Sequence, residues 1–132
     1  MDYLLDTNIC IHYFKGEFEL KDKIQSIGFD NFAISEITLA ELIYGSEKSQ
    51  KTRKNLRVVE DFANKIEILP VLTCLKLYGK EKIRLRSLGR TVEDLDLFIG
   101  STAIVNEMVM VTRNTREFKR LKGISVENWI DL

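Results

Sequence analysis

Four acidic residues stand directly beside apolar stretches of the chain, where an unpaired charge is costly. They are Asp6 after Leu4-Leu5, Glu41 within Leu39-Ala40-Glu41-Leu42, Asp96 before Leu97-Phe98-Ile99, and Glu117 before Phe118. An ionised carboxylate near a hydrophobic core is unfavourable unless it is paired or coordinates a metal ion. When several carboxylates converge, each raises the pKa of the others unless a cation lies between them. The four acids are therefore candidate metal ligands.

The other ligand types limit which metal such a site would hold. The chain has one histidine, and its two cysteines, Cys10 and Cys74, are far apart and lack the Cys or His spacing of a zinc site. We expect both cysteines to be buried free thiols. Oxygen ligands favour hard cations, so the predicted cofactor is Mg²⁺, with Mn²⁺ as the alternative.

Each acid also has a structural explanation that needs no metal. Asp6 is a good N-cap for a following helix, and Glu41 lies three residues after Thr38, which is the spacing of a capping box. The acids of residues 93–96 precede a predicted helix, where negative charge is favourable, and Glu117 has arginines close by that it could pair with. These explanations do not account for why acids follow two strands and lie within two apolar helices whose ends face one edge.

Apolar runs alternate with helical patterns along the chain, which indicates how distant acids could meet. The predicted strands cover residues 3–5, 32–34, 66–69, 108–111 and 125–126, and the predicted helices cover residues 9–14, 18–27, 35–45, 51–65, 74–88, 97–104 and 118–121. Strands separated by helices pair in parallel, which predicts an α/β fold: a three-layer α/β/α sandwich with a mainly parallel central sheet. Ligands bind beyond the carboxyl ends of such strands. Asp6 follows the first strand, and Thr112 and Asn114 follow the fourth, so we expect them at one edge.

The length and composition are typical of one globular domain, which we expect to span residues 1–132. Apolar residues make up 45% and charged residues 30% of the chain, and no biased tract indicates disorder. The N-terminus lacks a signal-peptide pattern, and no apolar run approaches the roughly 20 residues that span a bilayer. We therefore expect a cytoplasmic protein with no membrane partner.

The formal net charge is zero, which by itself argues against a nucleic-acid partner, but the charges are unevenly distributed. Residues 48–90 carry twelve basic and four acidic side chains, whereas residues 1–47 carry nine acidic and three basic ones. This segregation suits an enzyme that binds phosphates in one place and a metal in another, although solvated helix faces would give the same pattern. The candidate phosphate contacts are Lys48, Lys51, Arg53, Lys54, Arg57 and the basic residues from Lys76 to Arg90. Tyr44 and Tyr78 could stack on bases, but core packing is the favoured interpretation.

Five stretches, taken together, resemble one known family. They are Leu5-Asp6-Thr7-Asn8, residues 35–45 (Ser-Glu-Ile-Thr-Leu-Ala-Glu-Leu-Ile-Tyr-Gly), Asp96-Leu97-Phe98-Ile99-Gly100, residues 112–118 (Thr-Arg-Asn-Thr-Arg-Glu-Phe), and Val126-Glu127-Asn128-Trp129. In this order and spacing, and over nearly its whole length, the chain resembles the PIN-domain ribonucleases. Among them it is most similar to the VapC-type toxins of bacterial toxin–antitoxin pairs.

The resemblance implies roles for the acids. It places Asp6, Glu41 and Asp96 on the metal-binding acids of the family. Many relatives have an aspartate where this chain has Asn114, whereas others have a glutamate where it has Glu117. We assign the fourth acid to Glu117, with Asn114 as a polar helper.

Ahead of the third acid the chain departs from the family, which often has Pro-Ile or Pro-Val there; this chain has Thr-Val-Glu-Asp-Leu at residues 91–95. The departure makes Asp94 a candidate outer ligand. The polar side chains expected to orient water or the phosphate oxygens of the substrate are Thr7, Asn8, Thr112 and Asn114. One or two metal ions would support in-line attack of water on the phosphodiester, which leaves a 3′-hydroxyl and a 5′-phosphate.

The resemblance also implies a substrate and partners. Relatives of this type cleave structured RNA, tRNA or ribosomal RNA, which inhibits translation. They pair with a cognate antitoxin whose C-terminal segment lies in the acidic groove and inserts a basic side chain there, and they usually form homodimers. Two alternatives stay open: a housekeeping PIN nuclease of RNA maturation, and a non-catalytic phosphate- or protein-binding module. The receiver-like form of that module has a lysine where this chain has Thr112-Arg113-Asn114.

Overall fold

The computed structural model describes residues 2–131, which form a five-stranded sheet with helices on both sides. The strands are β1 (Tyr3–Leu5), β2 (Phe32–Ser35), β3 (Glu67–Leu69), β4 (Val109–Val111) and β5 (Ser125–Glu127). Their order is β3-β2-β1-β4-β5, and every neighbouring pair is parallel. The predicted α/β fold is confirmed, and the sheet is entirely parallel rather than mainly so.

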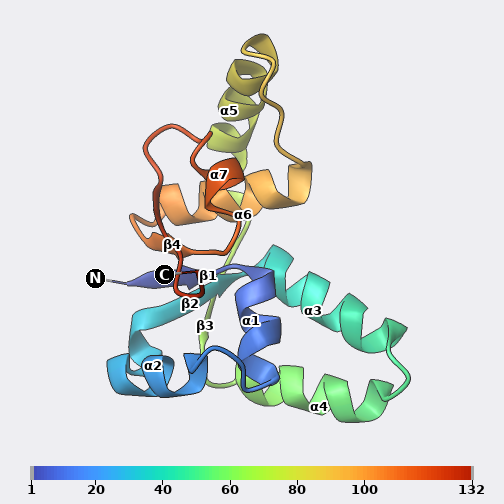
Figure 1. Ribbon diagram of the computed structural model, residues 1–132. Helices are drawn as coiled ribbons and strands as arrows, with labels where there is room; N and C mark the ends of the chain where they lie inside the picture. Colours follow the sequence, from blue (N-terminus) through green and yellow to red (C-terminus); the bar gives the residue numbers. More distant parts are fainter. Residues whose placement is uncertain (1, 132) are drawn as a thin grey trace.

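Seven α-helices connect and cover the strands within residues 2–131. They are α1 (Thr7–Phe14), α2 (Leu20–Ile27), α3 (Glu36–Lys48), α4 (Thr52–Ala63), α5 (Leu75–Ser87), α6 (Asp94–Val105) and α7 (Thr115–Phe118), with 3₁₀ turns at Phe29–Asn31 and Leu72–Cys74. Figure 1 shows α1 to α4 on one side of the sheet and α5 to α7 on the other, which makes the three predicted layers. Helix α6 begins ahead of its predicted start, so Asp96 lies inside its first turn.

Alternate residues of the strands face the two helical layers. Leu5, Ile34 and Val111 pack in one core with Ile9 of α1 and Phe62 of α4. The intervening strand residues pack in a second core with α6 and α7, whose members include Leu4, Ala33, Met110, Ile99 and Phe118. This alternation follows from the two-residue period of a strand in a sheet that is covered on both faces. The two cores hold the strands rigidly, so the positions of their carboxyl ends are well defined.

Two strands lead directly into helices at the carboxyl edge of the sheet. Asp6 follows β1, and its Oδ1 accepts a hydrogen bond from the Thr7 amide at 2.8 Å, which makes it the N-cap of α1. Ser35 ends β2 and caps α3 in the same way, because its Oγ accepts a hydrogen bond from the Ile37 amide at 3.0 Å. These caps satisfy amides that have no partner within the helix. Helices α1 and α3 therefore both begin at this edge.

The predictions for the cysteines are confirmed. Cys10 and Cys74 are both free and buried, and burial raises the pKa of both thiols. Within residues 2–131, none of the helices combines the length and the apolar character needed to cross a membrane.

The two tyrosines differ in their surroundings. Tyr78 stacks on Phe98 with ring centroids 4.0 Å apart, so its predicted packing is confirmed. Tyr44 is 66% exposed, and the interpretation that it packs in the core is wrong. The reason is helical geometry: Leu42 faces the core, and a residue two positions later lies on the opposite side of the helix.

Candidate active site

The carboxylate of Asp6 is held at the end of β1 by hydrogen bonds from two distant parts of the chain. Its Oδ1 caps α1, and its Oδ2 accepts a hydrogen bond at 2.8 Å from the hydroxyl of Thr112, the residue that follows β4. Asp6 is only 6% exposed. Burial raises the pKa of its carboxyl group, and the two hydrogen bonds oppose that rise only in part. The N-cap explanation is correct, and it leaves a buried and firmly oriented carboxylate at the sheet edge.

Glu41 reaches the same edge from the second turn of α3. The hydroxyl of Thr7 donates a hydrogen bond to Glu41 Oε1 at 2.6 Å, and the Thr38 hydroxyl oxygen lies 3.2 Å from that of Thr7. The capping-box explanation for Glu41 is wrong, because Ser35 is the N-cap of α3 and Thr38 lies within the helix. The Glu41 carboxylate instead links α3 to the start of α1, one residue from Asp6.

Asp96 is half-buried in the first turn of α6, and its pKa is raised to about 7. Burial is the largest cause, and the negative charges of Asp6, Glu117, Glu41 and Glu93 follow in that order. Charges perturb a neighbouring pKa only over short distances. The fold therefore brings the four predicted acids into one region from β1, α3, α6 and α7.

The segment after β4 supplies a chain of polar contacts. The Thr112 Oγ that donates to Asp6 also accepts a hydrogen bond from the Asn114 amide at 3.0 Å, and Asn114 Nδ2 donates to Glu117 Oε2 at 2.7 Å. The partner of Glu117 is therefore Asn114 rather than an arginine. Asn8 lies exposed at the start of α1, beside Thr7. The predicted polar residues thus lie on the two segments that also carry Asp6 and Glu117.

Asp94 is directed away from this cluster. Its Oδ1 accepts hydrogen bonds from Lys82 Nζ and from the Tyr78 hydroxyl, both at 2.8 Å, so the side chain joins α6 to α5. The charge of Glu93, rather than that of Asp94, acts on Asp96. From the sequence, Glu93 was read only as an acid that favours a helix start. Which of the two adjacent acids binds Lys82 depends on where α5 places that lysine, and no local pattern reports that.

Comparison with known proteins agrees with this geometry. Residues 3–124 match the family model described as "PIN domain". The chain is 38% identical to the tRNA(fMet)-specific endonuclease VapC of Salmonella typhimurium over 98% of both chains. This chain belongs to the VapC ribonucleases of the PIN-domain family. Among solved structures it resembles DNA-bound VapBC from S. typhimurium (TM-score 0.89, 37% identity, 98% of both chains). It also resembles VapBC2 from Rickettsia felis bound to a promoter DNA fragment (TM-score 0.90, 36% identity, 98% of this chain and 99% of that one).

The donor set of this VapC ribonuclease fits a hard divalent cation. All of the clustered side chains offer carboxylate oxygens, and the pKa values of Asp6 and Asp96 are raised partly by the other acids. Within residues 2–131, however, no three acidic, histidine or cysteine side chains already form a set of metal ligands. Glu41 is turned to Thr7 and Glu117 to Asn114.

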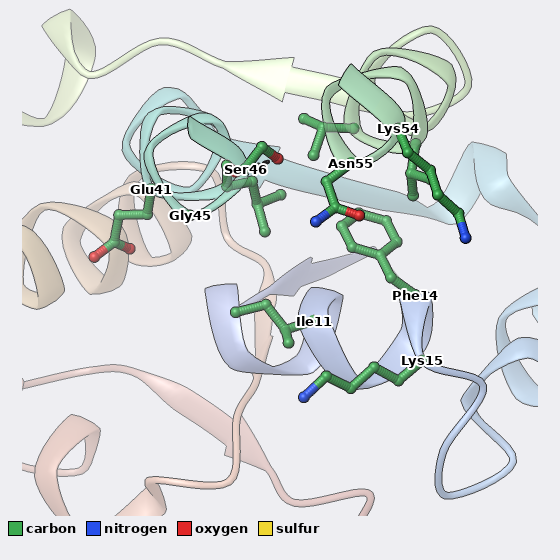
Figure 2. Close-up of a pocket in the computed structure, with 11 residues that line it drawn as sticks. Ile11, Phe14, Lys15, Glu41, Gly45, Ser46, Lys54 and Asn55 are labelled. Carbon is green, nitrogen blue, oxygen red and sulfur yellow. Dashed lines mark hydrogen bonds between the residues drawn. The ribbon is translucent and has the colours of Figure 1, made fainter. Parts of the chain in front are cut away.

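A groove between α1, α3 and α4 leads to the acidic cluster. It has a volume of about 460 Å³ and is lined by apolar side chains such as Ile11 and Phe14, with Lys15 and Lys54 among the polar residues. Figure 2 shows Glu41 at one end of the groove and Lys54 at the other. The sequence analysis predicts Lys54 as a phosphate contact but not Lys15, because the packing of α1 against α3 and α4 brings together residues that are distant in the sequence.

Proposed function

We propose that this VapC ribonuclease hydrolyses a phosphodiester of structured RNA with the help of Mg²⁺ held by Asp6, Glu41 and Asp96, and that Glu117 is the fourth acid. The observation that carries the proposal is the meeting of acids from distant segments at one edge of the sheet, where Thr112 binds Asp6 and Thr7 binds Glu41. The charges of Asp6, Glu117 and Glu41 also act on Asp96 and, after burial, raise its pKa. Such a cluster is electrostatically unfavourable unless a cation neutralises it. Mn²⁺ has similar ligand preferences and should substitute.

Some residues of the chain would hold Mg²⁺, and others would orient the carboxylates and the phosphate of the substrate. Mg²⁺, when bound, would neutralise charge on the phosphate and favour ionisation of the attacking water. Asp6 is oriented by two hydrogen bonds, and Thr7 holds Glu41 in place. Asn114 binds the acid Glu117, and Asn8 is exposed two residues after Asp6; both amide groups would hold phosphate oxygens of the substrate. In-line attack by water leaves a 3′-hydroxyl and a 5′-phosphate.

Basic residues on α3, α4 and the turn between them would bind the remainder of the RNA. Lys48, Lys51, Arg53, Lys54 and Arg57 are all exposed. Phosphate contacts of this kind depend on the release of counterions and weaken steeply as salt rises. The first substrate to test is initiator tRNA, because relatives from Salmonella typhimurium and Shigella flexneri are named tRNA(fMet)-specific endonucleases. Cleavage of that RNA would inhibit translation.

A cognate antitoxin would control the enzyme. Three of the similar solved structures, from Salmonella typhimurium, Rickettsia felis and Haemophilus influenzae, are described as VapBC, and the first two of these are bound to DNA. We propose that the C-terminal segment of the antitoxin occupies the groove between α1, α3 and α4 and places a basic side chain near the acids. We also propose a homodimer, for which exposed apolar residues such as Leu72, Ile83 and Leu88 offer a surface. Size-exclusion chromatography with light scattering tests the dimer.

The decisive experiment is incubation of purified protein with tRNA(fMet), and separately with total RNA, in Mg²⁺, followed by mapping of the cut ends. We expect cleavage by the wild type, none by Asp6→Asn, and unchanged cleavage by the control Asp30→Asn, which alters an exposed aspartate of the 3₁₀ turn before β2. Cleavage by Asp6→Asn, or full activity in excess EDTA, contradicts the proposed site. Expression of the chain alone in bacteria separates a toxin, which arrests growth, from a housekeeping nuclease.

A further inference from the structure

The loop between α1 and α2 holds an exposed aromatic residue in a strained conformation. Phe18 has φ 56° and Glu19 also has φ 56°, in the left-handed region that residues other than glycine rarely adopt. The Phe18 side chain is nevertheless large, apolar and 45% exposed. Strained residues of this kind persist when the surroundings enforce them, and they concentrate at functional sites.

Two side chains hold the Phe18 ring in place. The Arg113 guanidinium carbon lies 5.4 Å from the ring centroid, within the range of a cation–π contact, and the His12 ring meets Phe18 edge-on at 5.0 Å. Each of these side chains is itself fixed. Arg113 donates to both carboxylate oxygens of Asp131 at 3.0 and 3.2 Å, and His12 Nδ1 lies 2.8 Å from Glu17 Oε1. The Phe18 ring is thus held rigidly while much of it faces solvent.

This aromatic platform, formed by Phe18, His12 and Arg113, is joined to the acidic cluster through two segments of the chain. Arg113 directly follows Thr112, whose hydroxyl binds Asp6. His12 lies one helical turn after Asn8, so the two side chains share a face of α1. The platform is therefore connected both to the segment after β4, which holds Asp6, and to the face of α1 that carries Asn8.

We propose that an unpaired base next to the scissile phosphate stacks on Phe18, with Arg113 supporting the ring and offering charge to an adjacent phosphate. This inference rests on the proposed ribonuclease function and adds a determinant of substrate choice. A rigid aromatic ring backed by a guanidinium is the usual platform for single-stranded nucleic acid, and each stacked base contributes substantially to affinity. Phe18 does not touch the reacting atoms, so it acts on substrate binding.

The test compares Phe18→Leu, which keeps an apolar side chain but removes the π-face, with Phe18→Trp, which restores an aromatic face. With tRNA(fMet) and Mg²⁺ we expect Phe18→Leu to raise KM about tenfold with kcat within about twofold of wild type. We expect Phe18→Trp to retain the wild-type KM. Val105→Ala, at an exposed apolar residue at the far end of α6, is the matched control and should retain both constants.

A second measurement needs no cleavage and so separates this inference from the proposed function. Titration with a single-stranded RNA decamer in EDTA should show weaker binding by Phe18→Leu than by the wild type. In Phe18→Trp the same RNA should quench the fluorescence of the added indole. The proposal is overturned if Phe18→Leu matches the wild type both in KM and in RNA binding. The same holds if Phe18→Leu weakens only the binding of an antitoxin peptide, or if Phe18→Trp is as defective as Phe18→Leu.

Discussion

The hydroxyl of Thr112 donates a hydrogen bond to Oδ2 of Asp6 at 2.8 Å, across 106 positions of the sequence. The bond connects the residues that follow two adjacent strands, β4 and β1. It also lowers the pKa of Asp6 against the effect of burial, so it favours the ionised form that a metal ion requires. Thr112 thereby helps to set the charge of Asp6.

Replacing Thr112 with valine should lower the activity about 10- to 100-fold, which is typical when a group that orients a metal ligand is lost. The isosteric side chain removes the donor to Asp6, so the pKa of that carboxyl rises further and more Mg²⁺ is needed for half-maximal activity. Thr112→Ser keeps the donor and should retain most activity. Titration of activity against Mg²⁺ at fixed pH measures the difference. Equal Mg²⁺ requirements for Thr112→Val and the wild type would refute the role of this hydrogen bond.

Two neighbouring aspartates of α6 should respond in opposite ways to the same substitution. Asp96→Asn removes a carboxylate from the cluster and should abolish cleavage in a folded protein, whereas Asp94→Asn should leave cleavage near the wild-type rate. The reason is that Asp94 binds Lys82 and Tyr78 rather than facing the acids. Cleavage rates and circular dichroism spectra of both variants provide the check. A severe loss in Asp94→Asn with a native spectrum would restore Asp94 as an outer ligand.

Local patterns in the sequence predicted the elements and the edge at which they meet. Asp6 could be placed there because a short apolar run ends at it, and Thr112 because another run ends just before it. The apolar pattern predicts a start of α6 at residue 97, later than its actual start at Asp94, because Asp94-Leu95-Asp96 interrupts the pattern. Acids are nevertheless favourable in the first turn of a helix. Periodicity therefore located the elements well and their ends less well.

Contacts between elements were harder to predict, because they depend on side-chain directions that only the assembled fold determines. The spacing of Glu41 to Thr38 allows a capping box as the alternative to a metal ligand, yet Glu41 binds Thr7 of another helix. Arg113 has no feature in the sequence that points to Phe18, since the two are joined only through the packing of the loop against the end of β4. The resemblance to a known family predicted roles for the four acids that their spacing alone does not.

The raised pKa of Asp96 predicts how stability changes with pH. Without metal, the folded protein holds the Asp96 proton up to a pH of about 7, whereas an unfolded aspartate releases it near its ordinary value of 3.8. The folded state therefore binds more protons in this window, and its stability should fall as the pH rises from about 4 to 7. In EDTA we expect a lower Tm at pH 8 than at pH 6, measured by calorimetry in matched ionic strength.

Adding Mg²⁺ should raise the Tm more at pH 8 than at pH 6, since metal and proton compete for the same carboxylates. Asp96→Asn should reduce both the pH effect in EDTA and the gain from Mg²⁺. Some pH effect should survive in that variant, because the pKa of Asp6 is raised as well. A Tm shift from Mg²⁺ that is the same at both pH values would contradict the linkage.

A partly buried ion pair away from the acids links α5 to the segment after α7. Glu81 is 5% exposed, and its two carboxylate oxygens accept hydrogen bonds from Arg84 at 2.9 and 2.7 Å. The Lys122 amide donates to Glu81 at 3.1 Å, and Arg84 also donates to the Arg120 carbonyl at 2.7 Å. Chiefly through Arg84, these contacts lower the pKa of Glu81. The pair thus fixes the helix that carries Lys82 and Tyr78, the partners of Asp94.

Glu81→Gln should lower the free energy of unfolding by about 1–3 kcal/mol at pH 7, because it leaves the Arg84 guanidinium without its charged acceptor. The pKa of Glu81 is lower in the folded state than in the unfolded state, so its contribution is complete above about pH 5 and disappears as the pH falls through the folded value. The wild type and the variant should therefore differ in urea unfolding at pH 7 and converge in acid. Glu60→Gln, at an exposed glutamate of α4, should change stability by less than about 0.5 kcal/mol. A difference between wild type and Glu81→Gln that persists undiminished below the folded pKa would show that packing, rather than charge, is what Glu81 contributes.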